Sequence, residues 1–400
     1  MAPLPLAQII ILSSQAGLRV DLSLSEEQIL LRDSVEKYVR QHCSVERHRA
    51  VTRTELGFDD DAWQQFAQLG WLSVPFSEEL GGFAGGATDM IAITEALGKG
   101  LVREPLLTTV VTCGGFLHCA GSEQQRQQYI PAIINGSEQW AFAFAEKSGG
   151  YDLAQVHTTA LQRDGGYVLN GLKGTVLNAH CADYLVVSAR TSGSAGDVTG
   201  ITLFIVDANS NGVSTENFCA VDGSRGAHVY FDSVVLGADA VLGGVGNGHA
   251  LMLTVIDKAI VALGGEALGA MQALLDATVE YTKTRQQFGQ PISKFQVLQH
   301  RMADMYMKVE ETRSLLLNAA IQLDQNSLES PIACAALKVK VCEAGRLVAQ
   351  EAVQLHGGIG MTDELSIGHH YKRLMVLTKL YGDEAWYLQK FVDLAAARAA

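Results

Sequence analysis

The spacing of apolar residues divides the chain into a helical part, a strand-rich part and a second helical part. From Ser23 the apolar residues recur at helical intervals, and Ser25-Glu26-Glu27 is a typical signal for a helix N-terminus. Further helices are predicted over 59–69, from 90–97 onward and over 126–134. We therefore expect residues 23–138 to form an all-helical N-terminal domain.

At Gln139 the period of the apolar residues changes from about 3.6 to 2, which indicates strands. Four runs carry the pattern: Trp140–Ala145, Tyr167–Asn170, Tyr184–Val187 and Ile201–Val206. They predict a compact β domain, a barrel or sandwich, over 139–243. The Gly-rich segment that follows contains G-x-G spacing, but no βαβ unit surrounds it, so a Rossmann-type dinucleotide site is not expected.

The region 244–400 again shows helical spacing, with a break at 284–296 and a loop at 327–331. Its apolar stripes are typical of the core of a helical bundle. The whole pattern predicts an α+β protein with a helical N-terminal domain, a central β domain and a C-terminal four-helix bundle.

Composition narrows the classes of function. The 400 residues include 48% hydrophobic and 18% charged residues, as in globular proteins, and the net charge of −13 argues against nucleic-acid binding. Residues 1–22 are apolar in part, but no basic residue precedes the run and it is too short to span a bilayer, so we expect an N-terminal extension and no membrane span.

Cysteine and histidine spacing predicts neither disulfides nor a metal site. The seven cysteines include no C-x-x-C pair, so we expect reduced thiols and a cytoplasmic protein. His356, His369 and His370 have no partners at metal-ligand spacing, and we interpret them as structural residues.

The break between the two long C-terminal helices carries candidate binding chemistry. Arg285 precedes Phe288 and Gly289, and a fixed guanidinium beside an aromatic ring is suited to an anionic, planar ligand at a helix or subunit junction. On the residues alone, a plain corner between two helices explains the segment equally well.

A second segment adds to the first. The R-x-x-F-G pattern at 285–289 and the Q-x-x-G-G pattern at 354–358 together resemble the signature of the acyl-CoA dehydrogenases, and the resemblance runs from about Leu22 to the C-terminus. It implies that Arg285, Phe288 and Gln296 contact the diphosphate and adenine of FAD, and that a neighbouring subunit brings Gln354, Gly357 and Gly358 to the same FAD.

The resemblance is weaker in the β domain. Ala145 stands where the family has a hydroxyl residue that hydrogen-bonds the flavin, and Tyr151 replaces a Ser. Thr175 replaces a Trp and Leu177 a Thr. Backbone groups would then have to supply the flavin contacts of this domain.

The resemblance also indicates which positions should carry the catalytic base, and neither holds an acid here. The usual Glu position falls on Gly382, and the position that carries the base in some relatives falls on Ala259. We predict Asp383 as the base, with Glu266 and Glu384 as alternatives. A base supplied by a partner subunit, or no base at all, is an equally open interpretation.

By this resemblance the chain removes hydrogen from the α and β carbons of an acyl-CoA, passes electrons to an electron-transfer flavoprotein or similar acceptor, and forms a homo-oligomer or a heterotetramer with a related subunit. Segments 264–271 and 370–383 are most similar to small subunits of pimeloyl-CoA-type and steroid side-chain dehydrogenases. Two alternatives stay open: a non-catalytic or half-site partner subunit, and an acyl-CoA oxidase.

Overall fold

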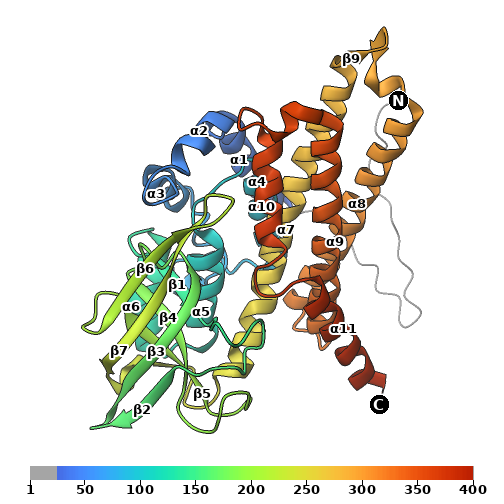
Figure 1. Cartoon of the computed structure of the whole chain (residues 1–400). Coiled ribbons are helices and arrows are strands. Elements are labelled where there is room, and N and C mark those ends of the chain that lie inside the picture. The colour runs from blue at the N-terminus through green and yellow to red at the C-terminus, as the bar shows by residue number, and fades with distance from the viewer. Residues whose placement is uncertain (1–24, 400) are drawn as a thin grey trace.

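The computed structural model describes residues 25–399, and the extension predicted for residues 1–22 lies outside them. Helices, strands and helices follow one another along the chain. In Figure 1 the strands form one lobe at the lower left, and the long C-terminal helices stand beside it. This is the α+β architecture that the pattern of apolar residues predicts.

The N-terminal region is helical throughout and begins as its sequence signal indicates. Ser25 accepts a hydrogen bond from the Gln28 N–H, and the Gln28 side chain accepts one from the Ser25 N–H, so the two cap the first helix reciprocally. The helices are α1 Glu26–His42, α2 Val45–Val51, α3 Asp60–Gln68, η1 Glu78–Leu80, α4 Ala87–Lys99, η2 Leu106–Gly114, α5 Gly115–Ala120 and α6 Glu123–Ile134.

The segment η2 is a π-helix of 9 residues, a form that usually appears as a single turn near functional sites. The Thr112 hydroxyl donates to the carbonyl oxygen of Leu107, 2.7 Å away and five residues earlier, which helps to hold the wide turn. The π-helix widens the backbone beside the two cavities described below.

The β domain is one eight-stranded sheet rather than a closed barrel. Its order is β6-β7-β3-β2-β4-β5-β8, and β1 pairs with β4 in parallel. The strands are β1 Trp140–Ala143, β2 Thr159–Arg163, β3 Gly166–Leu177, β4 Tyr184–Arg190, β5 Ile201–Asp207, β6 Val213–Cys219, β7 Arg225–Leu236 and β8 Val241–Leu242, with a short 3-10 turn, η3 Ala238–Ala240, before β8.

Strand β1 connects the two cores of the molecule. Trp140 and Phe142 pack into the core that the helices form, whereas Ala141 and Ala143 pack into the core of the β domain. Because successive side chains of a strand point to opposite faces, the period of 2 in this strand places large residues on one side and small ones on the other.

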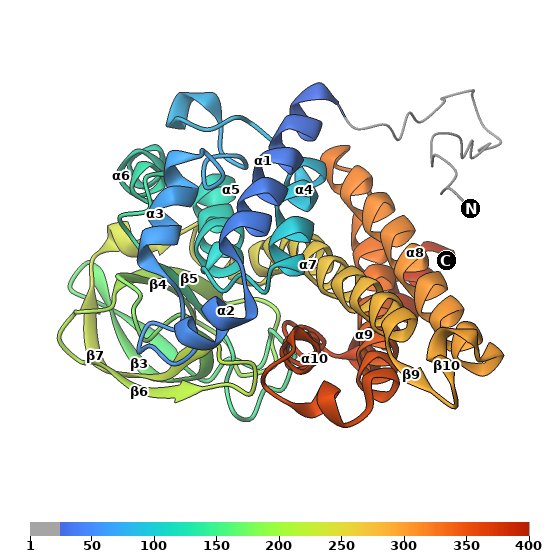
Figure 2. The same ribbon diagram turned by 90° about the horizontal axis from the view of Figure 1, so that it is seen from above.

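In the C-terminal region α9 packs against α7, α8, α10 and α11. Figure 2 shows these helices on the side away from the sheet, with α10 nearest to it. The elements are α7 Gly248–Thr284, β9 Gln286–Gln287, β10 Gln290–Pro291, η4 Ile292–Lys294, α8 Gln296–Asp324, α9 Ser330–His356, η5 Gly357–Met361, α10 Ser366–Leu377 and α11 Glu384–Ala399.

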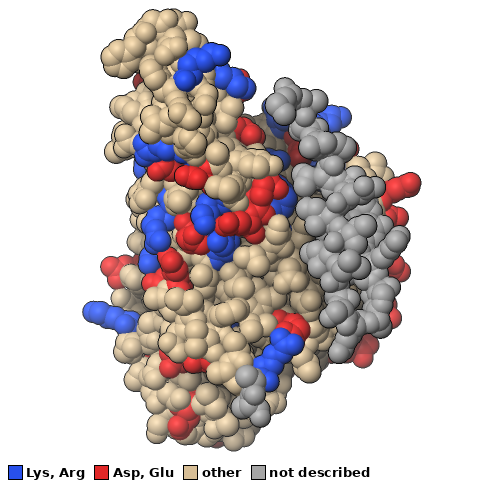
Figure 3. Space-filling model, turned by 90° about the vertical axis from the view of Figure 1, so that its right-hand side faces the viewer, with Lys and Arg blue, Asp and Glu red and all other residues tan. Residues whose placement is uncertain are grey.

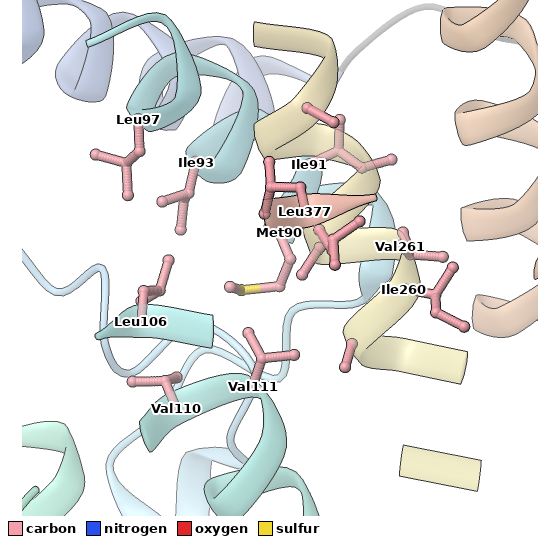
Figure 4. Packing of buried hydrophobic residues seen from close by; sticks show 14 of the residues in the cluster. Met90, Ile91, Ile93, Leu97, Leu106, Val110, Val111, Ile260, Val261 and Leu377 are labelled. Atoms are coloured by element: carbon pink, nitrogen blue, oxygen red, sulfur yellow. The ribbon is translucent and has the colours of Figure 1, made fainter. Parts of the chain in front are cut away.

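Helix α4 of the N-terminal region packs directly against α7. A Cβ atom on Gly98 would lie 2.1 Å from the Glu266 carbonyl oxygen, and one on Gly269 would lie 1.9 Å from the Glu95 carbonyl oxygen, so only glycine permits this approach. Figure 4 shows the apolar side chains that α4, η2, α7 and α10 place around this contact. Within residues 25–399 no helix is both long and apolar enough to cross a membrane.

Candidate functional site

A cavity of about 930 Å³ lies between the sheet and α10. Its walls come from β1 and the loop after it, from β3, β6 and β7, and from the end of α10. The cavity is thus built by two regions of the chain that are far apart in the sequence. Most of its lining is apolar or aromatic, and the polar residues among it are Thr108, Glu146, Lys147, Tyr151, Thr175, His228, Tyr230, Lys379 and Tyr381.

Three aromatic rings form a stack in one wall of the cavity. The ring centroids of Phe142 and Phe144 are 4.7 Å apart, and those of Phe144 and Tyr381 are 6.0 Å apart, with nearly parallel planes in both pairs. The Tyr381 hydroxyl lies 3.1 Å from Thr112 Oγ1, and burial raises the pKa of Tyr381 to about 12. This wall is suited to a flat, apolar group and offers no proton acceptor.

Within residues 25–399, Glu146 is the one acidic residue that lines this cavity, and its carboxylate is fully engaged. Lys173 donates to it at 2.7 Å, and the N–H groups of His157 and Thr158 donate at 2.8 and 3.0 Å. Burial opposes the charge of Glu146, but Lys173 and these hydrogen bonds outweigh burial and lower its pKa. Glu146 therefore fixes the loop after β1 and is a poor general base.

All four residues at which the β domain departs from the family pattern line this cavity: Ala145, Tyr151, Thr175 and Leu177. The sequence comparison therefore selected residues that the structure brings together. At the Thr175 position the backbone is left-handed, with φ of 53°, and its N–H donates to His228 Nδ1 at 3.2 Å.

The residues predicted to hold the FAD diphosphate lie elsewhere. Arg285 ends α7 and precedes the small ribbon of β9 and β10, where Phe288 is 92% exposed. Gln296 begins α8 and is also exposed. Within the described part of the chain, no carboxylate forms a salt bridge with Arg285, so its guanidinium is free for an external anion.

The second predicted segment lies beside the first. Tyr281, one turn before Arg285, stacks on His356 with ring centroids 4.4 Å apart, and His356 ends α9. Gly357 and Gly358 follow it, and a Cβ atom on either glycine would meet nothing within 4 Å. One chain therefore presents both segments on the same exposed surface, and the approach of the two segments to one FAD from different subunits stays a prediction.

This surface is remote from the cavity. Figures 1 and 2 both show β9 and the end of α9 on the opposite side of the molecule from the sheet, and no residue of 285–296 or 354–358 lines the cavity. In Figure 3 the same upper end of the helical layer is mostly uncharged, with a small group of basic residues. A single subunit does not bring the predicted phosphate-binding residues to its own cavity.

The usual base position cannot carry a side chain in this backbone. Gly382 has φ of 137°, and a Cβ atom there would lie 2.4 Å from the Tyr387 ring and 2.7 Å from the Trp386 ring. Tyr381, the preceding residue, also has a positive φ, of 60°. Ala259, the other family position, is fully buried in α7. Neither position supplies a proton acceptor.

The three acids that we considered as the base each have partners. Asp383 accepts from the Trp386 N–H at 3.2 Å, which caps α11, and from Lys379 at 3.1 Å. The N–H bond and Lys379 lower the pKa of Asp383. Glu384 pairs with Arg346 at 2.9 Å, and Glu266 pairs with Arg373 through both oxygens. None of the three lines the large cavity.

The partner of Glu266 belongs to a network that the sequence did not reveal. Arg373 on α10 also donates to Asp222 at 2.9 Å, and Arg103, from the loop after α4, donates to the same carboxylate at 3.1 Å. Burial works against the charge of Asp222, but the two guanidiniums lower its pKa. The network joins the N-terminal helices, the sheet and the bundle, and it borders a second cavity of about 90 Å³.

Family models for the three parts of an acyl-CoA dehydrogenase match this chain in order. The N-terminal domain model matches residues 25–137, the middle domain model 141–234 and the C-terminal domain model 246–389. The chain belongs to the acyl-CoA dehydrogenase family. Within the described residues no group of three or more His, Cys, Asp or Glu is placed to hold a metal ion.

Individual relatives share most of the chain. Mitochondrial isovaleryl-CoA dehydrogenase from Solanum tuberosum is 30% identical over 371 residues, which are 92% of this chain and 89% of that protein. A solved Tcur3481-Tcur3483 steroid ACAD variant is 29% identical, with a TM-score of 0.85 over 94% of this chain and 99% of that one. The FAD complex of PigA is 26% identical, with a TM-score of 0.87 over 95% and 100%.

Proposed function

We propose that this acyl-CoA dehydrogenase family member acts in the α,β-dehydrogenation of an acyl-CoA thioester, in an oligomer that completes each FAD site across a subunit junction. One observation carries the proposal: the chain has an apolar cavity at one side and an exposed, unpaired Arg285 with open glycines at the other. Two subunits that exchange these surfaces would form complete sites, as in a closed two-fold dimer.

The residues present fit a FAD group. Arg285, Gln296 and the open backbone at Gly357 and Gly358 would hold its diphosphate and adenine, because a guanidinium binds phosphate oxygens in bidentate fashion and glycine permits close approach. The stack of Phe142, Phe144 and Tyr381 would face its ring. When bound, FAD supplies the acceptor for the hydride from the substrate Cβ.

The proton from the substrate Cα needs a base, and our prediction for it stays Asp383. To accept that proton, the Asp383 carboxylate must leave Lys379 and the Trp386 N–H and turn toward the cavity that Tyr381 lines. Gly382 is the flexible residue at which the backbone can allow this movement. Hydrogen bonds to the thioester carbonyl would stabilise the enolate charge that develops.

A specific observation favours a second candidate function, the half-site partner subunit. Of the described residues, Glu146 alone is an acid that lines the large cavity, and Lys173 holds its carboxylate. Position 382 has no room for a side chain. Such a chain would donate its FAD-binding surface to a related subunit that carries the base. The likeness to the Tcur3481-Tcur3483 steroid ACAD supports this candidate and a bulky acyl substrate.

A visible spectrum separates the two candidates. The chain is purified alone and together with a co-expressed related subunit, and acyl-CoA is added without oxygen. Flavin that is bound and bleached in the chain alone supports the dehydrogenase. Flavin that appears only with the second subunit supports the partner. A chain that binds no flavin in either preparation contradicts the proposal. Peroxide release in air would identify an oxidase, whereas a dehydrogenase would pass its electrons to an electron-transfer flavoprotein.

Single-turnover flavin reduction tests the base. Asp383→Asn should slow reduction by about a hundredfold or more with flavin still bound, because proton abstraction by a positioned group contributes on that order. Glu384→Gln and Glu266→Gln are the matched variants. An unchanged rate in Asp383→Asn removes Asp383 from the mechanism.

A further inference from the structure

The small cavity of about 90 Å³ is lined by an unusual concentration of unpaired polar atoms. Three of these atoms, Arg103 Nε and Nη1 and Arg225 Nε, are buried and have no hydrogen-bond partner in the part of the chain that the structure describes. The Arg103 side chain is 4% exposed, so water outside the protein does not reach these nitrogens. Buried donors are nearly always paired in folded proteins, and three unpaired donors at one cavity therefore indicate a missing acceptor.

The carboxylates around the cavity do not supply that acceptor. Glu104 accepts from Arg47 with one oxygen and from the Arg103 N–H with the other. Glu266 uses both oxygens on Arg373, and Asp222 accepts from Ser224, Arg103 and Arg373. Every acid next to the cavity is thus already engaged.

Arg225 leaves a positive charge at the cavity without a counter-charge. Its Nη2 donates to the carbonyl oxygens of Thr52 and Thr54, and among the described residues no carboxylate lies within 4.0 Å of its guanidinium. The fourth unpaired atom is His180 Nδ1. Because His180 Nε2 faces the Leu56 carbonyl oxygen at 2.9 Å, Nδ1 becomes a donor only when the ring is protonated.

The small cavity adjoins the large one. Thr108, Leu177 and Leu380 line both, so these residues form the wall that the two cavities share. For a ligand whose reacting end lies in the large cavity to reach Arg103 and Arg225, it must pass between these shared residues. The volume exceeds the ~10–15 Å³ that one water needs, so a carboxylate group fits.

We propose that the small cavity binds the carboxylate at the far end of the acyl chain, so that the substrate is an acyl-CoA thioester with a terminal carboxyl group. The inference rests on the proposed function, which places the thioester in the large cavity. Arg103 and Arg225 are specificity-determining residues in it. Guanidinium nitrogens bind carboxylate oxygens in a fixed fork, and at a buried site such a bond discriminates strongly against a methyl end.

Calorimetric binding to the purified protein tests the proposal without turnover. Two series of acyl-CoA esters of matched and increasing chain length are compared, one ending in a carboxylate and the other in a methyl group. At the chain length that reaches the small cavity, the thioester with a carboxylate end should bind about tenfold or more tightly than the thioester with a methyl end. The carboxylate end forms a charged hydrogen bond there, and the methyl end forms none. Acetate should compete with the carboxylate ester and not with the methyl ester.

Three variants locate the site. Arg103→Lys keeps the charge beside Asp222 but removes the forked donors, and Arg225→Gln removes the uncompensated charge without touching the Asp222 network. Both should abolish the preference for the carboxylate ester and leave binding of the methyl ester unchanged. Arg190→Lys is the matched control, because Arg190 is also buried with an unpaired Nε but lines neither cavity. It should keep the preference.

The outcomes are distinguishable. Equal binding of the two series overturns the carboxylate proposal and leaves the proposed function standing, whereas no binding of either series overturns both. A preference that survives in Arg103→Lys and Arg225→Gln shows that the carboxylate binds elsewhere. Binding of acetate without any preference for the carboxylate ester shows that the cavity holds a free anion, which also overturns the substrate assignment.

Discussion

Gly382 shows how one residue constrains the chemistry of the whole site. Its φ of 137° lies in a region that residues with a Cβ rarely adopt, and the Tyr387 and Trp386 rings fill the space where a side chain would begin. The sequence comparison indicates only that an acid is missing here. The structure adds that a carboxylate cannot be restored at this position without moving two aromatic rings.

We predict that Gly382→Ala lowers the free energy of unfolding by about 2–4 kcal/mol, from backbone strain together with overpacking. Chemical denaturation measures this. Gly81→Ala is the matched control, because Gly81 also has a positive φ, of 87°, but nothing lies within 4 Å of an added Cβ atom. The control should lose only about 1–2 kcal/mol. Equal losses in the two variants would show that the rings give way freely.

Arg285 is the residue on which we predict that FAD binding depends most directly. Because it is exposed and has no salt-bridge partner among the described residues, Arg285→Ala should leave the fold and the melting temperature of the flavin-free protein unchanged. It should purify with much less flavin, and Arg285→Lys with an intermediate amount, since Lys acts only as a point charge on phosphate. The absorbance spectrum of each purified variant gives its flavin content. A flavin content in Arg285→Ala equal to that of the wild type would remove Arg285 from the cofactor site.

Among the elements, those with strong periodicity were predictable. The cap at Ser25, the period of 2 from Trp140 and the long helices around 284–296 all appear where the sequence places them. Strand β6 was missed because it is an edge strand with mostly exposed side chains and therefore lacks alternation. The π-helix η2 was missed because no periodic signal distinguishes it from an α-helix.

The cofactor and substrate sites were predictable to different degrees. Motif spacing selected Arg285 and the glycines at 357–358 as cofactor residues, and their role stays a prediction. The departures from the family pattern selected four residues that line the cavity. The network of Arg103, Asp222 and Arg373 could not be found, because these residues are far apart in the sequence and the segment 370–383, which contains Arg373, does not indicate its partners. Only the packing of three domains brings them together.

Asp257 is a buried acid that links α7 to α11 and makes stability depend on pH. Burial raises its pKa to about 6, although Lys390, 3.5 Å away, opposes the shift. Because the folded state holds a proton that the unfolded state has released, stability falls as pH rises from about 4 to 6 and stays lower above that.

We predict that Asp257→Asn raises the free energy of unfolding at pH 7 by roughly 1–3 kcal/mol, and that this gain disappears at pH 4. Urea denaturation at the two pH values measures it. Asp276→Asn is the control, because Asp276 is an exposed acid on the same helix. A gain of equal size at both pH values would mean that burial of the charge is not its cause.

The whole molecule places the two surfaces that we propose as halves of a FAD site on opposite sides. The cavity lies between the sheet and α10, and the surface of Arg285, Gln354, Gly357 and Gly358 lies at the far end of α7 and α9. If both halves served one FAD within one chain, the chain would have to fold differently. The proposed exchange between subunits would bring the surface that contains Arg285 of one subunit to the cavity of another.

Mixing two defective subunits tests this arrangement. Arg285→Ala removes the phosphate-binding half, and Gly174→Phe fills the cavity, where an added Cβ atom has its nearest neighbour 3.8 Å away at His228. Each variant alone should bind almost no flavin. A mixed dimer, isolated with two different affinity tags, has one subunit with an intact cavity facing another with an intact Arg285, so it should bind half the flavin of the wild-type dimer. Wild-type dimers that are reassembled in the same way are the control and should recover their flavin. If they do and the mixed dimer stays colourless, the two halves act within one chain.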